Sequence, residues 1–239
     1  MILAIVFVAT LIRSAFGFGE ALIAVPLLAF CMPIQIAAPL AVLVSITIAG
    51  IVVVQDWRHI HVRSAGWLVV STLFGIPFGL LLLTHSPEHL VKAMLGGLIL
   101  VFALFCLLGN MRVQLHHDRR PWLLTCGFVA GILGGAYGMN GPPLVIYGTM
   151  RNWTAQHFRA TLQAYFLPAS ILGMCGYFCA GLWTRTVTYD YVICLPAMLP
   201  AVFLGRAINH RLSGAGFSRY LYLGLAMIGV GLLAQSIVH

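Results

Sequence analysis

Long apolar runs separated by short polar stretches dominate this chain. Six runs approach spanning length, at residues 35–54, 65–83, 91–108, 160–182, 190–205 and 219–238. A helix that crosses the hydrocarbon core of a bilayer needs about 20 such residues. The runs lack the polar–apolar alternation of membrane barrel strands. The pattern therefore predicts an all-α polytopic membrane protein.

Two further apolar segments, residues 1–31 and 121–150, are too long for one straight crossing. Each is interrupted near its middle, by Gly-Phe-Gly-Glu at 17–20 and by Gly-Met-Asn-Gly-Pro-Pro at 138–143. The flanking arms hold roughly 9–16 residues, or about 14–24 Å of helix. Since about 15 Å reaches the middle of a bilayer core, we expect each segment to form a re-entrant hairpin of two short helices.

The two halves of the chain share landmarks in the same order, which predicts an internal duplication. The repeats would cover residues 1–109 and 121–239, joined by a polar linker at 110–120. The matching positions are Ala15-Phe16-Gly17 with Ala136-Tyr137-Gly138, Trp57 with Trp183, Gly79 with Gly205, and Leu95-Gly96 with Leu223-Gly224.

The distribution of basic residues favours two inverted repeats. If both long segments are hairpins, ten arginines fall on one side of the membrane and only Lys92 and Arg185 on the other. If both segments cross fully, the eight spans leave six basic residues on each side. The positive-inside rule therefore predicts that each repeat is a re-entrant broken-helix hairpin plus three transmembrane helices, with both termini periplasmic and the linker cytoplasmic. Eight plain spans remain the alternative.

Composition agrees with a membrane protein and excludes several function classes. The chain is 61% hydrophobic and 8% charged, whereas soluble domains carry roughly 25% charged residues. Its net charge of +8 comes from basic residues placed singly, which does not indicate a nucleic-acid partner. The chain lacks the sequence motifs of intramembrane or zinc enzymes, and its loop histidines have no acidic partner, so no enzyme activity, metal or cofactor is expected.

The second break has features of a helix start. Asn140 is a candidate N-cap, and Pro142 or Pro143 suits the first helical turn. The free N–H groups and the positive dipole end of such a helix would point to the centre of the protein. Two tips of this kind predict a small-anion site. The alternative is that the glycines serve only close helix packing.

Charged and polar side chains extend this prediction. Arg13, one turn before the first break, could add positive charge or reach toward an interface. Glu20 could carry a proton, or cap its helix and pair with Arg13. Gln163 is a candidate cavity-lining donor, whereas Ser45, Thr47 and Tyr165 suit bonds between helices. The predicted anion-binding residues are Arg13, Gly17, Phe18, Gly19, Glu20, Tyr137, Gly138, Met139, Asn140, Gly141, Pro142 and Gln163.

Both breaks resemble signatures of the TauE/SafE family of sulfite exporters. The first resembling segment is Phe16 to Pro26 and the second is Gly134 to Pro143, while Arg159 in Phe158-Arg159-Ala160-Thr161 also fits. Many family members have three consecutive glycines where this chain reads Gly17-Phe18-Gly19-Glu20. The resemblance implies movement of small sulfur-containing anions, such as sulfite or organosulfonates, across the bacterial inner membrane.

The sequence thus gives the hypothesis of a secondary transporter for a small sulfur-containing anion, working by alternating access around the two tips. Its expected partners are the anion, protons as coupling ions, and the lipid bilayer, and a homo-oligomer is left open. The alternatives are an uncoupled small-anion channel and a structural or assembly subunit. The particular anion and the direction of transport do not follow from the sequence.

Overall fold

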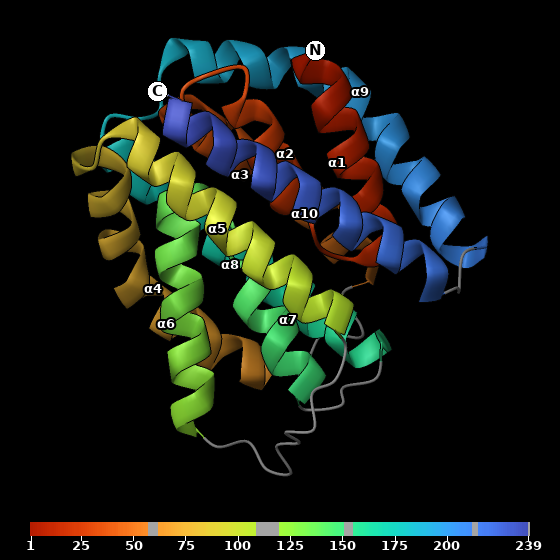
Figure 1. The fold of residues 1–239 in the computed structure, drawn as a ribbon. Helices are drawn as coiled ribbons and strands as arrows, with labels where there is room; N and C mark the ends of the chain where they lie inside the picture. Colours follow the sequence, from red (N-terminus) through yellow and green to blue (C-terminus); the bar gives the residue numbers. More distant parts are fainter. Residues whose placement is uncertain (57–61, 109–119, 151–154, 212–214, 239) are drawn as a thin grey trace.

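The computed structural model describes residues 1–56, 62–108, 120–150, 155–211 and 215–238. Within these ranges the chain forms ten helices and no strand (Figure 1). They are α1 (Ile2–Phe16), α2 (Glu20–Ala29), α3 (Ile34–Asp56), α4 (Val62–His85), α5 (Glu88–Leu108), α6 (Arg120–Tyr137), α7 (Gly141–Met150), α8 (Ala155–Cys179), α9 (Arg185–Arg211) and α10 (Ala215–Val238).

The first long segment is broken where the glycines predict. Helix α1 ends at Phe16, and Gly17 caps it with φ 83°, its N–H donating to the Arg13 carbonyl at 2.6 Å. Gly19, with φ 98°, precedes α2. Both residues adopt the left-handed conformation that glycine enters without steric cost. The chain can therefore reverse here, and α2 packs back against α1.

The second long segment is broken in the same manner. Helix α6 ends at Tyr137, and Gly138 has φ 66° with its N–H donating to the Gly134 carbonyl at 2.9 Å. Pro142 and Pro143 occupy the first turn of α7, as predicted. In Figure 1, α1 descends from the end of the molecule where both termini lie, whereas α6 rises from the opposite end. Neither segment runs as one uninterrupted helix.

Several helices are suited to cross a membrane. By length and composition, four described stretches qualify: Ile34–Ile51, Gly66–His85, Glu88–Leu108 and Arg185–Gly205. The apolar stretches described within α8 and α10, Ala164–Cys179 and Tyr222–Ser236, are shorter. Large apolar side chains such as Phe74, Val101 and Met227 are exposed on the helix surfaces. Such a surface suits lipid, and the chain is a multi-pass membrane protein.

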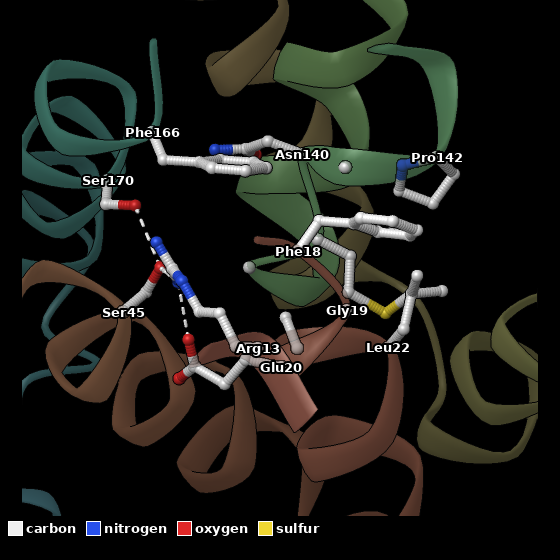
Figure 2. A pocket seen from close by; sticks show the side chains of 14 residues that line it. Arg13, Phe18, Gly19, Glu20, Leu22, Ser45, Asn140, Pro142, Phe166 and Ser170 are labelled. Atoms are coloured by element: carbon white, nitrogen blue, oxygen red, sulfur yellow. Dashed lines mark hydrogen bonds and ion pairs between the residues drawn. The ribbon is translucent and has the colours of Figure 1, made fainter. Parts of the chain in front are cut away.

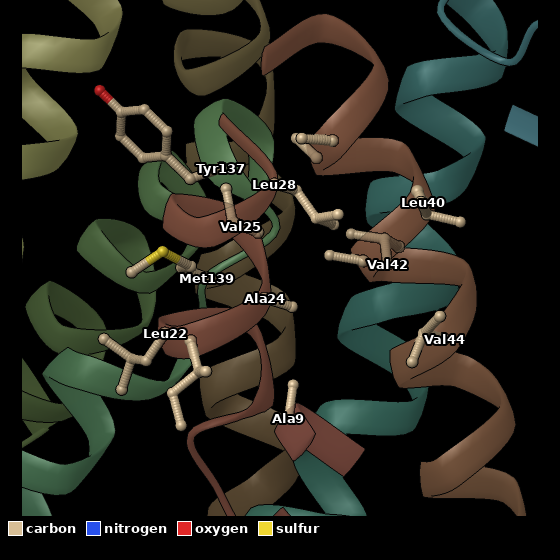
Figure 3. Packing of buried hydrophobic residues seen from close by; sticks show 14 of the residues in the cluster. Ala9, Leu22, Ala24, Val25, Leu28, Leu40, Val42, Val44, Tyr137 and Met139 are labelled. Carbon is tan, nitrogen blue, oxygen red and sulfur yellow. The ribbon is translucent and has the colours of Figure 1, made fainter. Parts of the chain in front are cut away.

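Helix α2 and the two breaks are enclosed by other helices. Leu22, Val25 and Leu28 of α2 are at most 2% exposed. They lie among buried residues of α3 and near Met139 at the second tip (Figure 3). Irregular backbone at membrane depth is tolerated where protein surrounds it. The packing therefore shields both breaks from lipid.

Contacts between helices follow a pattern that exchanges the two halves. Helix α4 packs on α6 and α9 packs on α1, while α3 packs on α8 and α5 on α10. A Cβ atom added to Gly79 would run into α6, and one added to Gly205 would run into α1. The positions touched are Ile132, Gly135 and Ala136 on α6, and Leu11, Ser14 and Ala15 on α1.

The three positions touched on α6 follow the three touched on α1 by 121 residues each, namely Leu11 and Ile132, Ser14 and Gly135, and Ala15 and Ala136. This is the offset between the two breaks in the predicted duplication. The matched glycines thus meet matched partners on opposite halves. The boundaries of the repeats stay a prediction, and most of the 110–120 linker lies outside the described residues.

Candidate functional site

A small pocket lies where the two breaks meet (Figure 2). The first break contributes its tip and the start of α2, the second break contributes the end of its turn and the start of α7, and α1, α3 and α8 complete the wall. The lining residues are Arg13, Phe18, Gly19, Glu20, Ala21, Leu22, Ser45, Gly138, Met139, Asn140, Gly141, Pro142, Phe166 and Ser170. Most of the predicted anion-binding residues are among them.

An ion pair joins the two arms of the first hairpin inside this pocket. Arg13 Nη1 donates to Glu20 Oε2 at 2.5 Å. The Arg13 side chain is 4% exposed and that of Glu20 is 1% exposed. Charges at this depth are tolerable only when paired. The predicted pairing of Arg13 with Glu20 is therefore confirmed, and Arg13 does not reach toward an interface.

Three further side chains surround the Arg13 guanidinium group. Arg13 Nη1 also donates to Ser45 Oγ of α3 at 2.5 Å, and Ser170 Oγ of α8 lies 3.4 Å from that hydroxyl. The ring of Phe166 covers the guanidinium, with its centroid 5.1 Å from Cζ. A cation over an aromatic face is attracted by the ring quadrupole. The cation is thus fixed in place by helices from both halves.

Several buried polar atoms in the pocket are left without hydrogen-bond partners in the described part of the chain. These atoms are Nε and Nη2 of Arg13, Oε1 of Glu20 and Oδ1 of Asn140. Buried polar groups are normally satisfied, so such atoms need an explanation. The cavity between them is about 20 Å³, which is room for about one water molecule. The guanidinium thus offers free donors to a small cavity.

The two tips differ in what they offer an anion. Helix α2 begins with Glu20, Ala21 and Leu22 at the pocket, and each has a backbone N–H. Helix α7 begins with Gly141, but Pro142 and Pro143 have no N–H. The two tips therefore offer different numbers of backbone donors to an anion. The first tip has the larger set of donors and Arg13 beside it.

Asn140 corrects one detail of the predicted helix start. It directly precedes α7, yet its Oδ1 accepts no hydrogen bond from the described residues, so its side chain does not cap the helix. The side-chain amide instead lies where a Cβ atom on Gly134 would be. Glycine at 134 leaves this room, and the proline at 142 removes one of the N–H groups that a cap would use.

Two described residues of the predicted set, Gly17 and Tyr137, do not line the pocket. Gly17 forms the left-handed end of α1 beside it. The Tyr137 ring points toward α5, where its hydroxyl donates to the Val91 carbonyl at 3.1 Å (Figure 3). The side chains of Gln163 and Arg159 lie outside the described residues.

The lining also includes residues that the sequence argument did not place there, namely Ala21, Leu22, Ser45, Phe166 and Ser170. Ser45 was expected to bond between helices, and its contact with Arg13 shows that it does. The same expectation is confirmed for Thr47, which bonds Tyr191 of α9 at 2.6 Å, and for Tyr165, which bonds Thr72 of α4 at 2.7 Å. An aromatic or hydroxyl residue in an apolar run gives no sign of the face on which it lies.

Known proteins of similar sequence are membrane transporters. A probable sulfite/organosulfonate exporter TauE of Cupriavidus necator is 23% identical over 94% of this chain and 88% of its own length. A probable membrane transporter protein of Methanocaldococcus jannaschii is 22% identical over 95% of this chain and 92% of its own length. No solved structure matches the chain significantly.

The similarity extends over the whole arrangement of helices described above. Residues 2–232 match the family described as sulfite exporter TauE/SafE, and this range includes both breaks and all the residues that line the pocket. The family consists of membrane exporters and not of enzymes. The chain is accordingly a membrane transporter, and it belongs to the TauE/SafE sulfite exporter family.

Proposed function

We propose that this protein is a secondary transporter that carries a small sulfur-containing anion, of the sulfite or organosulfonate type, across the bacterial inner membrane. The observation that carries the proposal is Arg13, a buried cation whose Nε and Nη2 have no partner among the described residues and which lies in the pocket between the two breaks. A planar guanidinium presents parallel donors that match an oxyanion. The name of the Cupriavidus relative agrees with this class of substrate.

The anion would be held at mid-membrane between the first tip and the second. Arg13 would supply the charge, the N-terminal amides of α2 would add donors, and Asn140 would supply its side-chain amide group from the opposite wall. Helix N-termini favour negative charge through their dipoles and free N–H groups. Two broken helices that meet at a substrate site are a recurring device of secondary transporters.

Alternating access is supported by the helix packing. The exchange of partners between α4·α6 and α9·α1 is what two inverted repeats would produce, because each repeat then packs against the other in the same way. The cavity of about 20 Å³ between the described residues is too small for an anion of several heavy atoms. A carrier in a closed state explains this better than an open channel.

The proposed orientation has both termini in the periplasm. Its support is the count along the sequence, in which ten arginines fall on one side of the membrane and the termini on the other, because the positive-inside rule assigns the arginine-rich side to the cytoplasm.

The substrate class can be tested by counterflow of radiolabelled sulfite and methanesulfonate in proteoliposomes. We expect saturable exchange in the wild type, and thermal stabilisation of the purified protein by an anion that binds only the folded state. Asn140→Leu keeps the side-chain shape but removes its polar atoms, so the exchange rate should fall about tenfold or more. Gln235→Leu, outside the pocket, is the control. Flux without saturation or counterflow would favour a channel instead.

A further inference from the structure

The pocket already contains an anion, the carboxylate of Glu20. The Glu20 carboxylate accepts a hydrogen bond from Nη1 of Arg13, which also donates to Ser45 Oγ. In this conformation the cavity has no room for a substrate. In Figure 2 the guanidinium lies between the Glu20 carboxylate and the wall formed by Ser45 and Phe166. A substrate anion that binds Arg13 must therefore come close to an existing negative charge.

The hairpin fold does not require this ion pair. At the offset of 121 residues, the counterparts of Arg13 and Glu20 in the second half are Gly134 and Gly141. The second hairpin nevertheless has the same break, with a left-handed glycine at 138 and helices that pack against each other. One tip of the pair is thus built without charges. The charges of the first tip need a reason other than forming the turn.

Charge balance supplies that reason. In the closed state Arg13 and Glu20 together are neutral. Adding a monovalent anion would give the site one net negative charge. Both side chains of the ion pair are almost fully buried, and an uncompensated charge at that depth is strongly unfavourable. If Glu20 takes up a proton as the anion binds, the site remains neutral, and the neutral carboxyl group no longer needs Arg13.

We propose that Glu20 is a tethered anion that competes with the substrate for Arg13, and that it gives way by binding a proton, so that one proton moves with each monovalent anion. This inference rests on the proposed function and adds its coupling ion. The only bond that forms is the O–H bond of the Glu20 carboxyl group, made with a proton from the side on which the anion binds. It breaks when the proton leaves with the anion on the other side. Binding of either partner then favours binding of the other, as linkage requires.

Glu20 has no competitor for the proton within the pocket. Arg13 and Glu20 are the ionisable groups among the described residues that line it. The elements packed around Glu20 otherwise present neutral side chains: Ser45 from α3, Phe166 and Ser170 from α8, and Met139 and Asn140 from the second tip. An arginine is not deprotonated in proteins. Proton binding coupled to the anion therefore falls on one carboxylate.

The test compares the wild type with Glu20→Gln in proteoliposomes, with methanesulfonate as the anion because its charge does not change with pH. Sulfite, compared at matched pH, replaces it if methanesulfonate is not carried. In the wild type an acidic exterior should drive accumulation of the anion against its gradient, and the apparent Kd should rise by up to about tenfold per pH unit as the solution becomes alkaline. Glutamine imitates the protonated acid, so Glu20→Gln should bind the anion more tightly at alkaline pH, with a Kd independent of pH, and lose acid-driven accumulation.

Glu88→Gln is the matched control, because Glu88 pairs with Lys92 at 2.9 Å on the protein surface, away from the pocket. It should behave as the wild type. Counterflow without acid-driven accumulation in the wild type, or accumulation that persists in Glu20→Gln, would overturn the coupling role and leave the proposed transport intact. Absence of counterflow for every sulfur anion would overturn the proposed transport, and the coupling with it. Glu20→Asp keeps a titratable group and should retain a pH-dependent Kd. A loss of pH dependence in Glu20→Gln alone therefore cannot be explained by poor folding of variants at this position.

Discussion

Arg13 combines a structural role with the proposed role in anion binding, and the two can be separated. Its partner Glu20 is 1% exposed, so removing the arginine leaves an uncompensated buried carboxylate. We expect Arg13→Gln to lower the free energy of unfolding by about 3–5 kcal/mol. Thermal unfolding of the purified protein measures this loss.

The double variant Arg13→Gln/Glu20→Gln removes both charges and should regain most of that stability, because no unpaired charge remains. It should still fail in counterflow, since the cation is gone. A double variant that is stable and transports normally would exclude Arg13 from anion binding. Arg13→Lys keeps the charge without the planar fork, and should give transport between these extremes.

Sequence reasoning reached part of this site for definable physical reasons. Arg13 and Glu20 flank a glycine break, so a chain reversal brings them together whatever the rest of the fold does. Ser45, Phe166 and Ser170 come from unbroken helices, where the face toward the pocket depends on how α3 and α8 pack. The orientation of Tyr137 toward α5 likewise depends on tertiary packing.

At the scale of helices, the breaks were predictable because glycine and proline act locally on the backbone. The close approach of particular helix pairs was not predictable, since it depends on which glycines face a neighbouring helix. Gly205 is an example: a Cβ atom there would lie 2.5 Å from both the Leu11 carbonyl oxygen and the Ser14 Cβ of α1. The duplication matched this residue to Gly79, but only the packing explains why both are glycine.

Substitution of these matched glycines gives a prediction about the interfaces. Gly205→Ala and Gly79→Ala should each destabilise the protein by about 1–3 kcal/mol, because the added methyl group meets the facing backbone. The two losses should be similar, since the contacts are equivalent. Gly97→Ala is the control: its Cβ would have no neighbour within 4 Å, and alanine favours the helix by up to about 1 kcal/mol. Equal thermal stability of all three variants would contradict close packing at these positions.

At the scale of the whole molecule, the count of basic residues was informative because it depends on the number of crossings rather than on packing. Six crossings and eight crossings both place the termini on one side, and in the structure the start of α1 and the end of α10 lie at the same end (Figure 1). The count separates these two topologies only through the sides on which the basic loops fall. The same count cannot reveal which helices touch. The pairing of α4 with α6 and of α9 with α1 emerges only from the fold.

Cys31 allows a test of both the hairpin and its orientation. It is exposed at the end of the first hairpin, with its Sγ 3.6 Å from Met1 Sδ, so the hairpin begins and ends on one side. In a variant that keeps Cys31 as its single cysteine, an impermeant maleimide should label it in intact spheroplasts. A cysteine added before Met1 should be labelled in the same way, because it lies on the same side. A cysteine at position 118, in the linker, should be labelled only after the membrane is permeabilised.

Labelling of the linker but not of Cys31 in intact spheroplasts would reverse the orientation and preserve the hairpin. Labelling of the N-terminus and Cys31 from opposite sides would mean that the first segment crosses the membrane, and two inverted halves could then no longer meet tip to tip.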